Sequence, residues 1–399
     1  MKKGFYYYKT SDCYFLESID TGSFFSLGKN EFTLFQNNND EIIDVLIKNK
    51  VISKHKNSDT FSIMVLMNNF CNLNCTYCFE NKKSKKNEEI SDTIINHIIE
   101  NFKLNNDITF TGGEPLLSFN KIQKICDYLE HKKINASFSI VTNGLNLNET
   151  ILNYLNKHKF EVQISLDGSI PKNNYKNDRT NIFVESIILK NIDKIVENYN
   201  SIKLTLRINF SKKDLNTYKQ RINSLLDYFQ DNLDKISFDF KLVDLPINDE
   251  QYLPPYDRYQ AYKKMYKFLH SKKLSLPSNF IDGGYCMARN KNIILINQQG
   301  YKFPCFSFVD YDEFNLDNNN NFYNYSINCK KICHLYDICM GGCIYGNFCD
   351  TGYIKSQCNY KYLDSLNRQL FLYKLIELGY IDSSRKDEVN NVETLLVDI

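Results

Sequence analysis

The stretch FSIMVLMNNFCNLNCTYCFE, residues 61–80, decides the fold. An apolar run, 61–67, leads into three cysteines, Cys71, Cys75 and Cys78, with the spacing C-x3-C-x2-C. A structural zinc site or a fully ligated iron–sulfur cube takes four protein ligands. Three thiolates can instead hold three irons of a [4Fe–4S] cube and leave the fourth iron open to a small molecule. A zinc site with a distant fourth ligand, or three buried thiols, are the alternatives.

Downstream of the cysteines, apolar strand-like runs alternate with stretches of helical periodicity. The predicted strands are 107–110, 137–141, 161–164, 203–206 and 236–243, and the predicted helices are 117–131, 149–158, 182–199 and 213–229. Such alternation is typical of βα units around a parallel sheet. Together with the run at 61–67, it predicts an α/β fold with a parallel sheet.

Short glycine and polar motifs follow three of these strands directly. They are TGGEP at 111–115, TNG at 142–144 and SLDG at 165–168. Gly112 and Gly113 carry no Cβ, so we expect a ligand to lie against the backbone there, although glycine also suits a plain turn. Asn143, Ser165 and Asp167 carry short polar side chains suited to ribose hydroxyls, although Asn-Gly and Asp-Gly are also common turns.

With Tyr77 before the last cysteine and these motifs in this order, the chain resembles the radical S-adenosylmethionine (radical SAM) superfamily. The resemblance implies that the α/β fold is a partial (β/α)6 barrel of the TIM type, whose mouth is formed by loops at the carboxyl ends of the strands. It also implies that the cluster on the three cysteines binds the amino and carboxylate groups of S-adenosylmethionine (SAM) through its open iron. It implies that Gly112, Gly113 and Glu114 meet the methionine end of SAM, with Glu114 near the ammonium. Arg179 is the expected partner of the SAM carboxylate, with Arg207 as a second candidate. One departure is that residues 176–178, Lys-Asn-Asp, replace the histidine-aspartate approach of relatives.

Eight of the 13 cysteines crowd into residues 286–358. They are Cys286, Cys305, Cys329, Cys333, Cys339, Cys343, Cys349 and Cys358. Eight thiolates suffice for two four-cysteine clusters, and their spacing resembles the SPASM extension of radical SAM enzymes. The departures are three residues, where two are usual, between the third and fourth of these cysteines, and the extra Cys349.

By that resemblance, the ligands of the two auxiliary clusters interleave. The first cluster takes Cys286, Cys305 and Cys343, with Cys349 as a candidate fourth ligand, and the second takes Cys329, Cys333, Cys339 and Cys358. Without Cys349, the first cluster would have an iron open to substrate. Zinc sites are the main alternative, since a disulfide framework suits a small secreted domain and the chain shows no signal peptide.

The composition limits the possible partners. Lysine and arginine number 49 and aspartate and glutamate 47, which argues against a substrate bound through nucleic-acid phosphates. No apolar run approaches the ~20 residues of a membrane span. Oxygen-labile clusters and unpaired thiols predict a cytoplasmic protein.

We expect three segments: 1–58, a radical SAM core at 59–275 and a SPASM domain at 276–399. In the first, a hairpin at 14–20 and 23–27 precedes a helix at 41–51 and resembles a truncated winged-helix element that captures a leader peptide as an added strand. A packing appendage is the alternative. The helical stretch 360–380 is predicted to cap the SPASM domain, and the tail after Ser383 is predicted to be mobile.

The resemblance also implies the reaction. The reduced cluster cleaves SAM to a 5′-deoxyadenosyl radical, which abstracts a hydrogen atom from substrate, and the auxiliary clusters accept an electron or bind substrate. We therefore expect a radical SAM oxidoreductase that matures a ribosomally made precursor peptide, for example by a thioether or carbon–carbon cross-link, with flavodoxin or ferredoxin as electron donor. No residue is assigned as the catalytic base.

Other functions remain open. One is a formylglycine-generating maturase of the anaerobic sulfatase type, although Phe306 follows Cys305 where those enzymes carry aspartate. Another is a small-molecule radical SAM dehydrogenase. A zinc or electron-transfer scaffold is the non-enzymatic alternative, and it leaves the SAM motifs unexplained.

Overall fold

The chain forms two compact units, one made of Met1–Asn57, Leu253–Arg289 and Tyr323–Ile399 and the other of Ser58–Tyr252 and Asn290–Phe322. The computed structural model describes residues 2–19, 22–49, 51–52, 61–75, 77–78, 87–100, 106–172, 177–243, 245, 247–276, 288, 292–309, 312–317, 333, 335, 345, 348, 351, 358 and 360–398. The units divide the chain differently from the three predicted segments, because elements from both ends of the sequence share the first unit.

The second unit contains an eight-stranded sheet in the order β11-β10-β4-β5-β6-β7-β8-β9. Its strands are β4 (Phe61–Leu66), β5 (Asn106–Thr111), β6 (Ala136–Thr142), β7 (Glu161–Asp167), β8 (Lys203–Phe210), β9 (Ile236–Leu242), β10 (Ile293–Ile296) and β11 (Lys302–Phe303). The six predicted strands are confirmed and lie parallel in sequence order. The sequence did not predict β10, which adds parallel to β4, or β11, which pairs antiparallel with β10.

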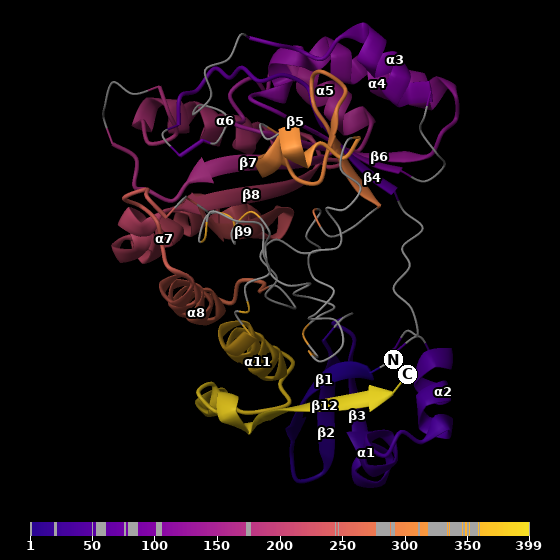
Figure 1. Ribbon diagram of the computed structural model, residues 1–399. Helices are drawn as coiled ribbons and strands as arrows, with labels where there is room; N and C mark the ends of the chain where they lie inside the picture. Colours follow the sequence, from indigo (N-terminus) through magenta and orange to yellow (C-terminus); the bar gives the residue numbers. More distant parts are fainter. Residues whose placement is uncertain are drawn as a thin grey trace. The chain divides into compact units, whose positions relative to one another are not determined.

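Helices connect these strands (Figure 1). They are α3 (Asp92–Glu100), α4 (Phe119–His131), α5 (Glu149–Lys157), α6 (Ile182–Asn198) and α7 (Tyr218–Tyr228), with short 3-10 turns η2 (Pro115–Ser118), η3 (Lys212–Asn216), η4 (Gln230–Lys235), η6 (Phe306–Phe308) and η7 (Asp312–Phe314). Asparagine caps set two of the starts: Asn148 accepts from Ile151 N, and Asn181 accepts from Phe183 N. The four predicted helices are confirmed, and α3 was not predicted.

Strand β8 shows how the sheet separates its two faces. Leu204, Leu206 and Ile208 are buried, whereas Thr205 and Arg207, which alternate with them, are only half-buried. Because successive strand residues point to opposite faces, the apolar set packs on one face and the polar set lines the other. The fold thus reserves one face of the sheet for polar side chains.

The first unit is a four-stranded antiparallel sheet covered on both faces. Its elements are β1 (Lys2–Lys9), β2 (Cys13–Ser18), β3 (Phe24–Gly28), α1 (Lys29–Gln36), α2 (Asp40–Lys48), α8 (Pro255–Ser271), α11 (Tyr360–Glu377), η9 (Ser383–Arg385), η10 (Val389–Asn391) and β12 (Val392–Asp398). Phe5 of β1 packs with Phe35 of α1 in one core. Tyr6, the next residue, stacks on Phe371 of α11 and donates to Asp364 at 3.1 Å. The predicted hairpin and the helix after it correspond to β2, β3 and α2.

The C-terminal tail corrects one expectation. We predicted that residues after Ser383 are mobile, and this is wrong, because β12 pairs with β1 from Lys2 to Tyr8, with Phe5 opposite Leu395 (Figure 1). Val392 and Val397 are fully buried there. A strand that adds to a partner almost 400 residues away has no local signal beyond its alternation, which explains the error.

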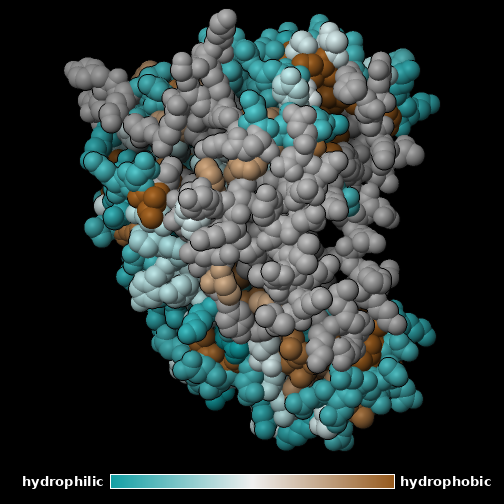
Figure 2. All heavy atoms as spheres, viewed as in Figure 1, coloured by the Kyte–Doolittle hydropathy of each residue, from teal (hydrophilic) through white to brown (hydrophobic). Residues whose placement is uncertain are grey.

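The surface gives no sign of a membrane span. Among the described residues, no helix is both long and apolar enough to cross a bilayer. The face drawn in Figure 2 is largely hydrophilic over the described atoms, with separate hydrophobic patches.

Candidate active site

The cysteine loop leaves the carboxyl end of β4 and rests on the loop after β5. Gly113 N donates to Asn68 O and Glu114 N donates to Phe70 O, both at 2.9 Å. A Cβ on Gly113 would lie 2.2 Å from Phe70 O, and a Cβ on Gly112, at φ +139°, would lie 2.4 Å from Asn68 O. The chain's own backbone therefore requires both glycines. This is a different reason from the ligand approach that we predicted, and contact of these glycines with SAM stays a prediction.

Glu114 is fully buried and joins the loops after β5 and β6. Its carboxylate accepts from Thr142 Oγ1 at 2.7 Å, Asn143 N at 2.8 Å and Leu116 N at 3.0 Å. Burial raises the pKa of this carboxyl group, and the three donors work against that rise. The structure thus gives Glu114 a positioning role between two loops, while its predicted contact with the SAM ammonium stays a prediction.

Asn143 contacts the first cysteine of the motif, Cys71. Its Nδ2 donates to Cys71 Sγ at 3.5 Å and to Asn72 Oδ1 at 2.7 Å, and its Oδ1 accepts from Leu145 N at 3.0 Å. Leu73 N also donates to Cys71 Sγ, at 3.3 Å. Its side chain thus contacts the cysteine loop, a role that nothing in the TNG motif indicates, and its expected contact with a ribose stays a prediction.

Ser165 and Asp167 are buried at the carboxyl end of β7. Asp167 Oδ1 accepts from Ser169 N at 2.9 Å, and Asp167 O accepts from Arg221 Nε at 3.0 Å. Burial raises the pKa of the Asp167 carboxyl group. Arg221 in turn binds Glu185 through two hydrogen bonds of 2.8 and 2.9 Å. Sequence reasoning missed this pair, although each charge stands on the apolar side of a predicted helix.

Arg179 reaches the cysteine loop from the segment before α6. Its Nη1 donates to Tyr77 OH at 3.1 Å, and its Nε is buried with no hydrogen-bond partner among the described residues. Two hydrogen bonds hold this segment against the cysteine loop: Asn177 Nδ2 donates to Asn72 O at 2.7 Å, and Asn74 N donates to Asn177 O at 2.8 Å. A buried donor without a partner needs an acceptor, and a bound carboxylate would supply one.

Arg207, the second arginine candidate, lies elsewhere in the sheet. Its Nη1 is 3.4 Å from Asp239 Oδ2 on β9, and its Nε donates to Asn209 at 3.4 Å. Of the two arginines, Arg179 is the one that contacts the cysteine loop, through Tyr77.

The donor set fits a multi-iron cluster. Cys71, Cys75 and Cys78 supply three thiolates, whereas a structural zinc site takes four protein ligands. In an iron–sulfur cube each thiolate binds a different iron, so three of them leave one iron open.

The cysteines must lose protons before they can bind iron. Burial raises the pKa of the Cys71 thiol to about 11 and also raises that of Cys75. Metal ligation requires thiolates and therefore releases these protons. The two donors to Cys71 Sγ are placed to stabilise its charged form.

The auxiliary cysteines fall largely outside the described residues. Cys305 follows β11, and Cys333 and Cys358 are described singly. The others, Cys286, Cys329, Cys339, Cys343 and Cys349, lie outside the described residues. The predicted division of the eight between two clusters stays a prediction.

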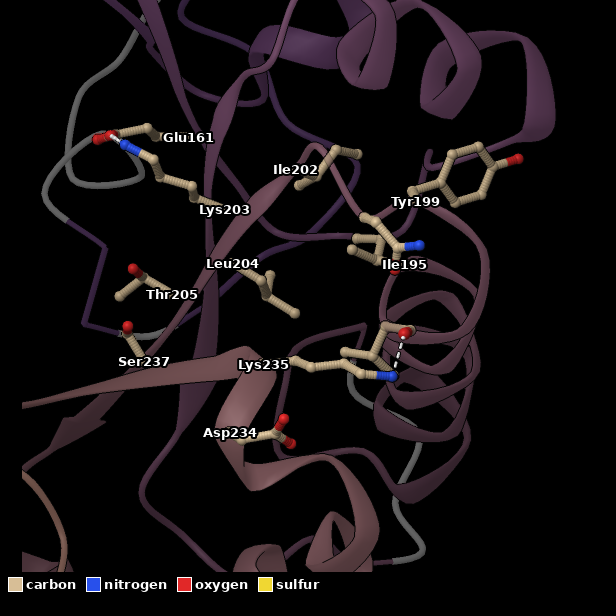
Figure 3. Close-up of a pocket in the computed structure, with 12 residues that line it drawn as sticks. Glu161, Ile195, Tyr199, Ile202, Lys203, Leu204, Thr205, Asp234, Lys235 and Ser237 are labelled. Atoms are coloured by element: carbon tan, nitrogen blue, oxygen red, sulfur yellow. Dashed lines mark hydrogen bonds and ion pairs between the residues drawn. The ribbon is translucent and has the colours of Figure 1, made fainter.

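A cavity of about 510 Å³ opens at the other end of the sheet (Figure 3). Glu161 and Lys203, at the amino ends of β7 and β8, line it and pair at 2.7 Å. Lys235 lies across from them and donates to Val196 O at the end of α6 (Figure 3). None of the predicted site residues lines this cavity, so it is separate from the cysteine site.

The sequence comparisons identify the core. The family model described as the radical SAM superfamily matches residues 65–219. Residues 65–219 form a radical SAM domain. That family uses a [4Fe–4S] cluster and SAM, and its named relatives are enzymes, so this radical SAM protein is an enzyme.

Three relatives show what the chain is similar to. An uncharacterized protein, MJ0907 of Methanocaldococcus jannaschii, is 40% identical over 110 residues, which span 27% of this chain and 38% of that protein. The radical SAM cyclopropyl synthase TigE of Paramaledivibacter caminithermalis is 26% identical over 70% of this chain and 68% of its own length. The cysteine-type anaerobic sulfatase-maturating enzyme of Clostridium perfringens is 23% identical over 68% and 85% respectively.

Solved structures share the fold. The structure of anSMEcpe with bound AdoMet superposes with a TM-score of 0.60 at 19% identity and covers 83% of this chain and 98% of its own. The crystal structure of Streptococcus suis SuiB bound to precursor peptide SuiA gives a TM-score of 0.54 at 15% identity, with coverage of 90% and 99%. At these identities the likeness establishes the fold of the radical SAM chain and nothing finer.

Proposed function

We propose that this protein is a radical SAM enzyme that modifies a ribosomally made precursor peptide. The observation that carries the first half is the convergence of three loops, those after β4, β5 and β6, on Cys71. Glu114 and Asn143 tie these loops together, and Arg179 brings a buried donor without a partner to the same place. When bound, the cluster and SAM supply a 5′-deoxyadenosyl radical, and the residues around them have to hold and shield it.

The residues can be given distinct tasks. Cys71, Cys75 and Cys78 would hold the cluster, and Asn143 would donate a hydrogen bond to its first thiolate. Arg179 would pair with the carboxylate of SAM through the Nε that lacks a partner. Asp167, buried at the end of β7, would face the ribose. The fixed backbone of its loop would keep it there.

The second half of the proposal, the peptide, rests on the relatives. TigE carries the name of a cyclopropyl synthase, and SuiB was solved with a precursor peptide. The first unit offers a strand-rich surface of the kind that takes up a peptide, because β3 is an edge strand of its sheet. We propose that a leader peptide adds there, that the eight C-terminal cysteines hold two auxiliary clusters, and that a flavodoxin or ferredoxin in the cytoplasm supplies electrons.

A formylglycine-generating activity is the second candidate. It is favoured by the match to the sulfatase-maturating enzyme over 85% of that protein's length. Phe306, the first residue of η6, stands directly after Cys305 in place of the aspartate expected for that activity. The two functions differ in product: a sulfatase-type maturase oxidises a cysteine or serine in a protein, whereas a peptide maturase acts on a precursor peptide.

The first test is SAM cleavage by anaerobically reconstituted enzyme with dithionite, read as 5′-deoxyadenosine by chromatography. Wild type and the matched control Cys13→Ala should form it, and Cys71→Ala should not, while Cys71→Ala keeps the iron of its auxiliary clusters. About twelve irons per wild-type chain are expected for three cubes. SAM cleavage by Cys71→Ala would overturn the assignment of the cluster to these three cysteines. About four irons per chain with bound zinc would exclude the two auxiliary clusters, and the proposal of a peptide substrate would lose its main support.

A further inference from the structure

A second group of metal-ligating side chains lies far along the fold from the cysteines. Asp127 and Glu130 stand in the last turns of α4, and His158 is the C-cap of α5. One ligand atom from each lies within 4.8 Å of the others. His158 comes just before β7 begins at Glu161, so the group is at the amino ends of the strands, whereas the cysteine loop is at their carboxyl ends.

The histidine is the informative member. Its side chain is only 6% exposed, and its Nδ1 is 4.0 Å from Glu130 Oε2, too far for a hydrogen bond. Its Nε2 is buried and has no hydrogen-bond partner among the described residues. Within the described part of the chain neither ring nitrogen makes a hydrogen bond, which is unfavourable for a buried imidazole, and a cation at Nδ1, the nitrogen that faces Glu130, would give one of the two a partner.

Two aromatic rings hold the imidazole in place. The ring of Tyr154 lies 4.2 Å from that of His158, and the ring of Phe138 lies at 6.4 Å, close to perpendicular. The imidazole is therefore preorganised in position.

The carboxylates are accessible and partly fixed. Tyr154 OH donates to Asp127 Oδ1 at 2.6 Å, which orients this carboxylate as an outer hydrogen bond commonly orients a metal ligand. Glu130 is exposed, and its present cationic neighbour is Lys157 Nζ, at 3.8 Å on an exposed, flexible stem. A lysine in that place can leave when a cation of higher charge arrives.

We propose that Asp127, Glu130 and His158 bind one divalent cation of the zinc type, with water completing its coordination. One imidazole and two carboxylates suit Zn²⁺, with ligand distances of about 2.0–2.2 Å. Ligands at that distance stand about 3.4 Å apart, so the exposed carboxylates have to close by roughly 1 Å. The bound cation would join the end of α4 to the end of α5. This site is independent of the radical chemistry proposed above.

The test uses full-length enzyme with its iron–sulfur clusters loaded, so that the cysteines are occupied. Zn²⁺ is added, unbound metal is removed by desalting, and zinc and iron are counted by mass spectrometry. Wild type should retain one zinc more than His158→Gln and one more than Glu130→Gln, at equal iron. His131→Gln, which alters another histidine of α4, should retain as much zinc as wild type.

The zinc contents of the variants decide whether the proposed site exists. Equal zinc in wild type, His158→Gln and Glu130→Gln would overturn the proposal, as would an equal loss in His131→Gln. Glu130 is exposed, so its variant gives an answer even where His158→Gln folds poorly. As a second measurement, Zn²⁺ should raise the thermal unfolding midpoint of wild type and leave that of Glu130→Gln unchanged, because a ligand stabilises only the state that binds it.

Discussion

The side-chain amide of Asn143 donates a hydrogen bond to the sulfur of Cys71 at 3.5 Å. The bond connects the loop after β6 to the loop after β4, across the intervening strand β5. Glu114 fixes the position of Asn143, because its carboxylate accepts a hydrogen bond from Asn143 N. The first ligand of the proposed cluster is therefore held by a polar chain that runs through three consecutive strand ends.

Replacing Asn143 with alanine should make the cluster harder to reduce. Hydrogen bonds to the sulfurs help to set the potential of an iron–sulfur cluster, and removing a donor leaves more negative charge on the thiolate. The midpoint potential should become more negative, and 5′-deoxyadenosine should form about fivefold more slowly, as for a loss of about 1 kcal/mol. Asn146→Ala is the control, since Asn146 contacts Asn72 rather than the sulfur. An unchanged potential in a fully loaded Asn143→Ala enzyme would argue against this role.

Gly113→Ala should prevent the cysteine loop from packing against the loop after β5. The added Cβ would meet Phe70 O at 2.2 Å, and that oxygen belongs to backbone that is itself hydrogen-bonded to Glu114 N. Overpacking a rigid site costs typically about 1–3 kcal/mol, and here the nearest atom cannot rotate away. We expect a lower thermal midpoint and about four fewer irons per chain. Gly28→Ala, whose Cβ would meet a flexible Glu31 oxygen at 3.4 Å, should behave as wild type.

The core could be predicted from the sequence because its signals are local. Each parallel strand is a short apolar run, and each site motif directly follows a strand, so the chain order alone places Asn143 and Asp167 at one edge of the sheet. The spacing of Cys71, Cys75 and Cys78 is likewise local. For the strands β4 to β9 a pattern of about ten residues was sufficient, whereas the equally short β10 and α3 were missed.

What could not be predicted depends on contacts between distant residues. Nothing near Val397 indicates that it pairs with Lys3 in a shared sheet. The reason for Gly113 also lies elsewhere in the sequence, in the backbone of Phe70. The contact of the Asn143 amide with Cys71 likewise has no signal in the residues around Asn143. Residue type limits the chemistry of a side chain, and the packing of other loops decides its partner.

Glu17 should make the first unit less stable as pH rises. It is 1% exposed on β2 and is paired with Lys374 of α11. Burial raises its pKa to about 7, and Lys374 only partly opposes the shift. Because the folded chain holds this proton more tightly, stability is complete below the ordinary carboxyl pKa and falls as pH rises through about 7. The loss should reach roughly 3 kcal/mol, at about 1.4 kcal/mol per pKa unit.

Thermal unfolding between pH 5 and pH 8 measures this effect. The midpoint of wild type should fall across that range, and Glu17→Gln should flatten the curve because it carries no titrating proton. Lys374→Met removes the opposing cation, so its midpoint should continue to fall to a higher pH than that of wild type. Parallel curves for wild type and Glu17→Gln would exclude Glu17 as the origin of any slope.

The pair of Arg221 and Glu185 allows stability to be separated from positioning. Both side chains are buried, and Arg221 also donates to Asp167 O. Arg221→Met should destabilise the core by about 3–5 kcal/mol, because it leaves the Glu185 charge buried and unpaired. Replacing both partners with apolar residues, as Arg221→Met with Glu185→Leu, should recover most of that loss.

The double variant should not recover the affinity for SAM. It restores packing but leaves Asp167 O without its donor, so the loop that carries the proposed ribose contact is released. Equilibrium dialysis with SAM should give a weaker dissociation constant for the double variant than for wild type, by about fivefold for one hydrogen bond of about 1 kcal/mol. Wild-type affinity in a stable double variant would mean that Arg221 supports the fold alone, and an unstable double variant would mean that the pair contributes more than the removal of an unpaired charge.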